Sequence, residues 1–288
     1  MNAIKHVDNN TGNGPGLSGA LLSGFPVVEA SLGIDRGTYV FEDFDRFSVI
    51  DAEVADGSDG AINGFYIRQD SAAVTRLNEV GGVIRFETDG SANDEVQITT
   101  GDLTASTGCG FCRFPTAVAS RKKFFFEARV RLGDVSDMSM FVGLKATGVG
   151  SSATARVLDD GASTITAGQS LVGFWLNTTG ELKTIVANAY NSSSAATFDL
   201  SAALTALSDA TWVKFSILYE PGPADSGSLK LFVDNAVVAS YADVDVSLPT
   251  QMDKDQNFAG VVYGIEETGA ANTLDIDHIA YGTTDYNA

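Results

Sequence analysis

The sequence has few cysteines, few histidines and few basic residues, and each shortage argues against a class of protein. Two cysteines among 288 residues do not make a disulfide framework. Two histidines, His6 and His278, make a zinc site or a Ser–His–Asp triad improbable. Lys and Arg number 18 against 37 Asp and Glu, which gives a formal net charge of -19. Such a surface repels nucleic-acid phosphates and anionic membranes, so we expect neither as a partner.

Long apolar runs are also missing. No stretch approaches the about 18 residues that a membrane helix needs. The first residues, Met1-Asn2-Ala3-Ile4-Lys5-His6, are polar and lack the apolar core of a secretory signal. We therefore expect no membrane insertion, and synthesis in a cytoplasm without a signal peptide.

What the sequence does have is enough apolar material for a large core. Hydrophobic residues make up 44% of the chain, which argues against wholesale disorder. The 30 Gly and 17 Phe against 4 Met favour strands and turns over helices. A chain of this length buries roughly three-quarters of its unfolded surface without disulfides or metals.

The chain divides into an arm, residues 1–37, and a body, residues 38–288. The arm is rich in glycine, and each glycine loses much backbone entropy on ordering while packing no side chain. We expect the arm either to lie along its own body or to dock on a neighbouring subunit. Its expected assembly contacts are apolar: Leu17, Leu21, Leu22 and Phe25.

The body shows the period-2 pattern of β-strands. In Lys123–Leu132 the apolar side chains of Phe124 and every second residue point one way, and Glu127, Arg129 and Arg131 point the other. Ser228–Asp234 and Ala236–Tyr241 form a hairpin through the Asp234-Asn235 turn. The other expected strands are Ser139–Lys145, Leu171–Asn177, Leu182–Asn188, Trp212–Glu220, Phe258–Ile265 and Thr273–Tyr281, with Thr178-Thr179-Gly180 as a second hairpin turn.

Many antiparallel strands with polar loops indicate an all-β sandwich or jelly roll. One short helix is expected at Leu200–Leu207. A domain boundary near residues 105–120 is an alternative, and a single sandwich is the simpler interpretation.

Three segments resemble concanavalin A-like jelly rolls, the fold of lectin, laminin-G-like and family-16 glucanase domains. The hairpin made by Trp212–Ile217 and Gly227–Asn235 resembles one in that fold. Phe125–Leu132 resembles the Phe-Glu-Ala-Arg strand of the glucanase branch, and Leu274–Tyr281 resembles its last strand. The resemblance implies an antiparallel concanavalin A-like β-sandwich.

The glucanase branch carries Glu-x-Asp-x-x-Glu on a strand soon after the Phe-Glu-Ala-Arg strand. The strands expected there, Ser139–Lys145 and Leu171–Asn177, contain no carboxylate. The nearest match is Glu87-Thr88-Asp89-Gly90-Ser91-Ala92, where Ala replaces the third acid. We therefore expect no catalytic residues and no enzyme, since a fold alone does not confer function.

Other possible sites each have a plain structural interpretation. Cys109 and Cys112 have CxxC spacing but no further ligand pair nearby, so two reduced thiols are expected. Calcium would need clustered oxygens, and the candidates are Asp56, Asp59, Asp89 and Asp94. Turns rich in Asp, Gly and Ser are common without metal, so no cofactor is expected and calcium stays an alternative.

The segment Asp275-x-Asp277-His278 is either a metal or acid–base cluster or part of a half-buried terminal strand. Strict alternation places Asp275 and Asp277 on one face with Ile279 and Tyr281, and His278 on the other with Leu274 and Ile276. The half-buried strand is the simpler interpretation.

Two functions follow as hypotheses. Tyr39–Phe47 resembles the opening of tailed-phage structural proteins, so the first is a virion protein made in the host cytoplasm. It would be a capsid decoration (cement) or fibre-like protein on the virion surface, anchored to capsid or other virion proteins through its arm. Because ordering the arm costs about 1–2 kcal/mol per residue, a homo-oligomer, with a trimer favoured, would help to supply the interface.

The alternative is a lectin-like module that binds surface glycans on the concave sheet. Trp175 and Tyr241 would then stack on sugar rings, although both residues also suit a core. A degenerate family-16-type hydrolase comes third.

Overall fold

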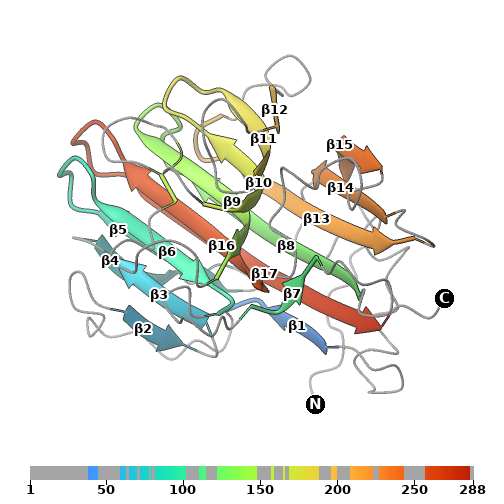
Figure 1. Cartoon of the computed structure of the whole chain (residues 1–288). Helices are drawn as coiled ribbons and strands as arrows, with labels where there is room; N and C mark the ends of the chain where they lie inside the picture. The colour runs from blue at the N-terminus through green and yellow to red at the C-terminus, as the bar shows by residue number, and fades with distance from the viewer. Residues whose placement is uncertain are drawn as a thin grey trace.

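The computed structural model describes residues 38–44, 59–62, 65–69, 72–77, 79, 82–101, 110–114, 122–147, 157–158, 165, 169–187, 196–199, 208–222, 227–242 and 257–285. Every regular element within these ranges is a β-strand (Figure 1). The strands pair antiparallel and form two sheets. The expected all-β antiparallel sandwich is therefore confirmed.

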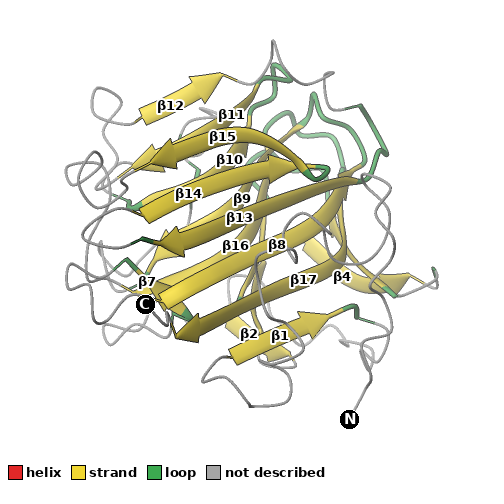
Figure 2. Cartoon of the chain, turned by 90° about the vertical axis from the view of Figure 1, so that its right-hand side faces the viewer, coloured by secondary structure: helices red, strands yellow, loops and turns green. Residues whose placement is uncertain are grey.

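The first sheet has eight strands. They are β1 (Thr38–Glu42), β4 (Ala72–Leu77), β5 (Val83–Thr88), β8 (Lys122–Leu132), β13 (Val213–Pro221), β14 (Gly227–Val233), β15 (Ala236–Ala242) and β17 (Thr273–Asp285). Their order is β15-β14-β13-β8-β17-β5-β4, and β1 is added beside β17. Figure 2 shows β14, β13, β8 and β17 side by side.

The second sheet has nine strands. They are β2 (Asp59–Ile62), β3 (Phe65–Gln69), β6 (Glu95–Thr99), β7 (Cys112–Arg113), β9 (Met138–Ala146), β10 (Leu171–Leu176), β11 (Leu182–Ala187), β12 (Ala196–Asp199) and β16 (Asn257–Glu266). Their order is β12-β11-β10-β9-β16-β6-β3-β2, and β7 pairs with β16.

The core lies between the two sheets. Phe124, Phe126 and Val130 of β8 belong to one buried cluster with Met140 and Val142 of β9. These residues alternate along their strands with side chains on the outer faces, as the period-2 pattern predicts. The strands expected from the sequence are confirmed to within a few residues at their ends.

Both expected hairpin turns are present. Asp234 and Asn235 have φ of 47° and 71°, the two positive values that a two-residue turn with the twist of the flanking strands requires. Asn and Asp reach this region at a lower cost than other non-glycine residues. The turn between β10 and β11 also contains a residue with positive φ, Gly180, whose φ is 75°.

Strand β17 departs from strict alternation at a β-bulge. Ile276 pairs with Val130 and His278 pairs with Arg129, so Asp277 is an extra residue in β17. Ile276 and Ile279 both face the core, and Asp277 and His278 both face outward. Two predictions are therefore wrong: that His278 shares a face with Leu274 and Ile276, and that Ile279 and Tyr281 share a face with Asp275 and Asp277. Both assumed strict alternation, which an extra residue in the strand interrupts.

The bulge also marks a change of neighbour along one edge of β17. Residues 273–276 of β17 pair with β5, whereas residues 279–283 pair with β1. The other edge pairs with β8 on both sides of the bulge. Two short strands therefore share one edge of the longest strand, and the bulge separates them.

Several expectations fall outside the described residues. They are the arm at residues 1–37 with Leu17, Leu21, Leu22 and Phe25, the helix at Leu200–Leu207, and most of the possible boundary at residues 105–120.

Candidate functional site

The outer face of the nine-stranded sheet carries a continuous row of functional side chains. Each is the register partner of the next on the neighbouring strand: Arg68, Gln97, Tyr263, Phe141, Trp175 and Lys183. With strands about 4.8 Å apart, this row spans about 24 Å. Aromatic rings lie at its centre, and the register continues to Asp59 on β2 beside Arg68 and to Asp199 on β12 beside Lys183. We call the six residues from Arg68 to Lys183 the outer row.

The centre of the outer row is flat and covered. Phe141 lies against Gly143 and Gly173, which are register partners on β9 and β10. Leu158 and Ile165, joined by a β-bridge, belong with Phe141 and Tyr263 to a second apolar cluster. This cluster buries the middle of the row, so the accessible positions lie toward its two ends.

The β3 end of the row is polar. The hydroxyl of Tyr263 donates to Oε2 of Glu95 at 2.8 Å, and Nε of Arg68 lies 3.3 Å from Oε1 of the same carboxylate. Burial, followed by the positive charge of Arg68, lowers the pKa of Lys145 to about 8, while Glu95 raises it. Arg68 and Glu95 therefore act electrostatically on Lys145 of β9, and the register partner of Arg68 on β2 is Asp59.

Besides Nε of Arg68, three buried polar atoms of the neutral residues on this face make no hydrogen bond with the part of the chain that the structure describes. They are Oε1 of Gln97, Oγ of Ser139 and Nε1 of Trp175. Buried polar atoms in proteins are nearly always paired with protein or ordered water. Each of these atoms therefore needs a partner that the described residues do not supply.

Tyr66 gives the β3 end an exposed ring. Its side chain is 37% exposed, one of two large hydrophobic residues with such exposure among the described residues. Tyr66 and Arg68 lie two residues apart on β3, so they share the outer face, and Tyr66 pairs in register with Thr99. Gln97 is its diagonal neighbour, within reach of a long side chain.

The two aromatic residues predicted from the sequence lie on different faces. Trp175 is on the outer row and 8% exposed, with Nζ of Lys183 5.5 Å from its ring centroid. Tyr241 on β15 belongs to the core between the sheets, and its hydroxyl lies 3.4 Å from Oγ1 of Thr184. The structure does not bring them together, so only Trp175 could contribute to a site on the outer row.

The acidic turns show the geometry of a turn. Asp89 accepts the Ser91 amide at 2.9 Å, and Asp94 accepts the amide of Asp89 at 3.2 Å. Burial and the hydrogen bond with Asp89 raise the pKa of Asp94 to about 6. Among the described residues no group of three or more His, Cys, Asp or Glu side chains is placed to hold a metal. Asp56 lies outside the described residues, as does the side chain of Asp59.

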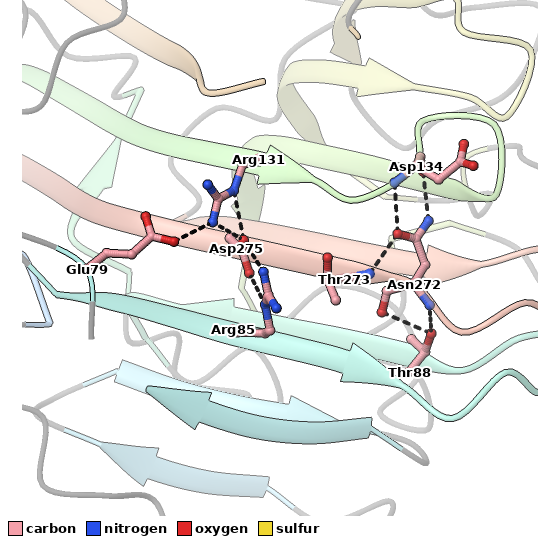
Figure 3. Close-up of polar contacts among 8 residues, drawn as sticks. All are labelled: Glu79, Arg85, Thr88, Arg131, Asp134, Asn272, Thr273 and Asp275. Atoms are coloured by element: carbon pink, nitrogen blue, oxygen red, sulfur yellow. Dashed lines mark hydrogen bonds and ion pairs between the residues drawn. The ribbon is translucent and has the colours of Figure 1, made fainter. Parts of the chain in front are cut away.

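Asp275, Asp277 and His278 meet on the outer face of the other sheet, and their partners are protein groups. Asp275 receives two hydrogen bonds from Arg85, at 2.7 and 2.9 Å, and two from Arg131, at 2.8 and 2.6 Å (Figure 3). Oδ2 of Asp277 lies 3.2 Å from Nδ1 of His278 and accepts a hydrogen bond of 3.0 Å from Nη1 of Arg129. This cluster joins β5, β8 and β17 of one sheet.

The remaining sequence candidates are separated from the outer row. Cys112 is buried in the core, and burial raises the pKa of its thiol well above the usual value. Cys109 lies outside the described residues. Glu87 and Asp89 lie on and just after β5, in the eight-stranded sheet.

Sequence reasoning missed Tyr66, Arg68 and Gln97. The signal was present, because β3 and β6 alternate apolar and polar residues: Phe65 and Ile67 face the core, and Tyr66 and Arg68 face outward. Residues 38–119 were too weakly similar to known strands for this pattern to stand out.

Comparison with known proteins gives the fold and no sequence family. No protein-family model matches the sequence, and no curated protein is similar to it. The described residues contain no helix long and apolar enough to cross a membrane.

Solved structures with a similar architecture include two plant lectins and a carbohydrate recognition domain. Peanut lectin shares 14% identity over 88% of this chain and 99% of its own, with a TM-score of 0.52. The winged bean acidic lectin, in complex with methyl-α-D-galactose, shares 10% over 87% and 100%, with a TM-score of 0.51. The carbohydrate recognition domain of Emp46p shares 12% over 85% and 95%, with a TM-score of 0.50. The chain therefore has a concanavalin A-like β-sandwich fold.

Proposed function

We propose that the protein binds carbohydrate at the β3 end of the outer row. The observation that carries the proposal is the buried Oε1 of Gln97, which has no hydrogen-bond partner among the described residues, beside the exposed ring of Tyr66. An aromatic ring stacks on the apolar face of a sugar, and an amide oxygen accepts a hydrogen bond from a sugar hydroxyl. Arg68 adds donors for ring or hydroxyl oxygens.

The similar structures support this function over a role in virion assembly. The winged bean lectin, one of the similar structures, was solved with a bound galactoside. Likeness at such low identity shows the fold, so the proposal depends on the residues of the outer row themselves. It is a proposal of binding without cleavage, as expected from the lack of a catalytic carboxylate motif.

A glycan array probed with the full chain, with and without calcium, tests the proposal. Wild type is expected to bind at least one glycan saturably, and Tyr66→Ala and Gln97→Met are each expected to weaken binding about tenfold or more. Val237→Ala is the matched control, because Val237 is 54% exposed on β15 of the other sheet. Equal binding by wild type and both variants would contradict the site. Absence of any saturable binding would contradict the function.

A further inference from the structure

The centre of the outer face of the eight-stranded sheet is buried. Phe125 of β8, Leu218 of β13 and Phe232 of β14 are 0%, 3% and 4% exposed. Phe124 and Phe126, on either side of Phe125, belong to the core between the sheets, so alternation turns Phe125 outward. Leu218 is the register partner of Phe125, and Phe232 lies on the next strand. We call Phe125, Leu218 and Phe232 the outer patch.

The strands of the sheet do not themselves bury the outer patch. Neighbouring side chains on one face of a sheet shield one another from the sides and leave their tips open to water. Lys230, the register partner of Leu218 on β14, has a side chain that is 37% exposed. Among the described residues, the ring that contacts the patch belongs to the same sheet: the ring centroid of Tyr39 on β1 lies 6.0 Å from that of Phe125. Burial of the patch therefore requires an occupant that lies over the sheet.

The polar groups beside the outer patch are paired within the sheet. Oγ of Ser216 donates to Oε2 of Glu127 at 2.6 Å, and Nε2 of His278 lies 3.3 Å from Oε1 of the same carboxylate. Arg129 donates to Asp277 at 3.0 Å. The occupant therefore needs apolar side chains and no acid of its own, because an added carboxylate would be buried beside Glu127 and Asp277.

We infer that residues 9–28 of the same chain cover the outer patch. This stretch has no charged residue, and it contains the four apolar residues of the arm that suit a contact: Leu17, Leu21, Leu22 and Phe25. Two other long segments outside the described residues, 45–58 and 243–256, are rich in acids. Residues 200–207 are uncharged but short, and they are held at one end by β12 of the other sheet.

The attachment point of the arm supports this position. The arm leads into β1, which pairs with β17 of the same sheet and brings the ring of Tyr39 next to Phe125. The 13 residue steps from Phe25 to Thr38 can span up to about 45 Å when extended. The distance from β1 across β17, β8 and β13 to β14 is only about 19 Å. The arm is therefore long enough to cross the whole patch.

The patch is buried in a single chain, so its occupant comes from that chain and not from a neighbouring subunit. Of the two positions that the sequence left open for the arm, the inference selects the one along its own body. It goes beyond the proposed function, because the outer patch and the outer row lie on different sheets and no saccharide takes part.

Hydroxyl-radical footprinting of the wild-type chain, read by mass spectrometry, tests the inference without any substitution. After correction for intrinsic reactivity, the four apolar residues of the arm are expected to be oxidised at least about tenfold more slowly than Val237, which is 54% exposed. Oxidation of the arm at the rate of Val237 would overturn the inference. Loss of protection on dilution would also overturn it, because the arm would then lie on a neighbouring subunit.

Full-length variants then identify the segment that covers the patch. Leu21→Asp combined with Phe25→Asp is expected to speed oxidation of the outer patch at least about tenfold and to leave Phe141 of the other sheet unchanged. The matched controls place one Asp in each alternative segment: Ile50→Asp, Leu204→Asp and Leu248→Asp. Each control should leave the patch protected. Exposure of the patch by a control and not by the arm variant would overturn the inference.

Discussion

Nε2 of His278 lies 3.3 Å from Oε1 of Glu127, and both side chains are buried. The other ring nitrogen, Nδ1, lies 3.2 Å from Oδ2 of Asp277. A neutral imidazole has one donor and one acceptor, so it satisfies only one carboxylate, whereas the doubly protonated ring satisfies both. Burial opposes the charged ring, but the hydrogen bonds to Asp277 and Glu127 outweigh it, and the pKa of His278 is raised.

His278 should therefore make stability depend on pH. A group whose folded pKa is raised stabilises the fold fully below its unfolded pKa of about 6.5 and loses that contribution as pH rises through the folded value. His278→Gln is expected to lower the free energy of unfolding by about 2 kcal/mol at pH 6. The difference from wild type should shrink at pH 9, as measured by urea unfolding.

His6→Gln is the control for that experiment, because His6 is the other histidine of the chain. A wild-type advantage over His278→Gln that is the same at pH 6 and pH 9 would show that the ring is not charged in the folded protein.

The ion pairs of Asp275 should be essential for stability, because they connect β17 to its neighbours β5 and β8. Its carboxylate is 1% exposed and pairs with Arg85 and Arg131 (Figure 3). Removing one partner of a buried ion pair leaves the others uncompensated. Asp275→Asn is expected to cost about 3 kcal/mol of unfolding free energy in urea titrations.

Glu87→Gln tests whether any loss of a carboxylate nearby has this effect. Glu87 is exposed on β5 and should change stability by less than about 0.5 kcal/mol. If both variants behaved alike, the ion pairs of Asp275 would contribute little.

The glycine pair under Phe141 should be intolerant of a side chain. A Cβ on Gly143 would collide with the carbonyl oxygen of Val172, which is backbone and cannot move aside. Gly143→Ala is expected to cost about 3 kcal/mol in the same assay. Gly180→Ala adds a methyl group in open space and should cost only about 1 kcal/mol, from its positive φ. Equal costs would contradict the close approach of β9 and β10.

The alternation of apolar and polar residues predicted much of the fold, because successive side chains in most strands point to opposite faces of the sheet. In β8, alternating residues reach the core, so its faces are readable from the sequence. In β17 the same rule failed after Ile276, because the bulge at Asp277 reverses the faces of every later residue. The bulge depends on pairing with β8 on one side and with β5 and β1 on the other, and no local window of the sequence contains these partners.

The candidate site was less predictable, because its residues meet only through sheet register. Arg68 and Gln97 are 29 positions apart in the sequence, and Trp175 is farther still, yet all stand in one row. Trp175 was recognised as an aromatic residue suited to sugars. Tyr66 was missed because the alternation of β3 predicts which face its side chain lies on but not whether other segments cover that face.

The assembly hypothesis depends on residues 1–37, which lie outside the described residues, and it stays a prediction. Deleting residues 1–37 should abolish incorporation into virus particles, as measured by co-sedimentation with them, if the arm is the anchor. The full chain is the control, and unchanged incorporation would argue strongly against the arm's role.

Hydrogen–deuterium exchange with a bound saccharide tests the central claim, that ligand binds at the β3 end of the outer row, most directly. The probe is whichever array glycan binds best, at saturation. The account predicts slower exchange in peptides that cover β3 and β6, with no change in β14 and β15 of the other sheet. Protection confined to the eight-stranded sheet, with β3 and β6 unchanged, would contradict it.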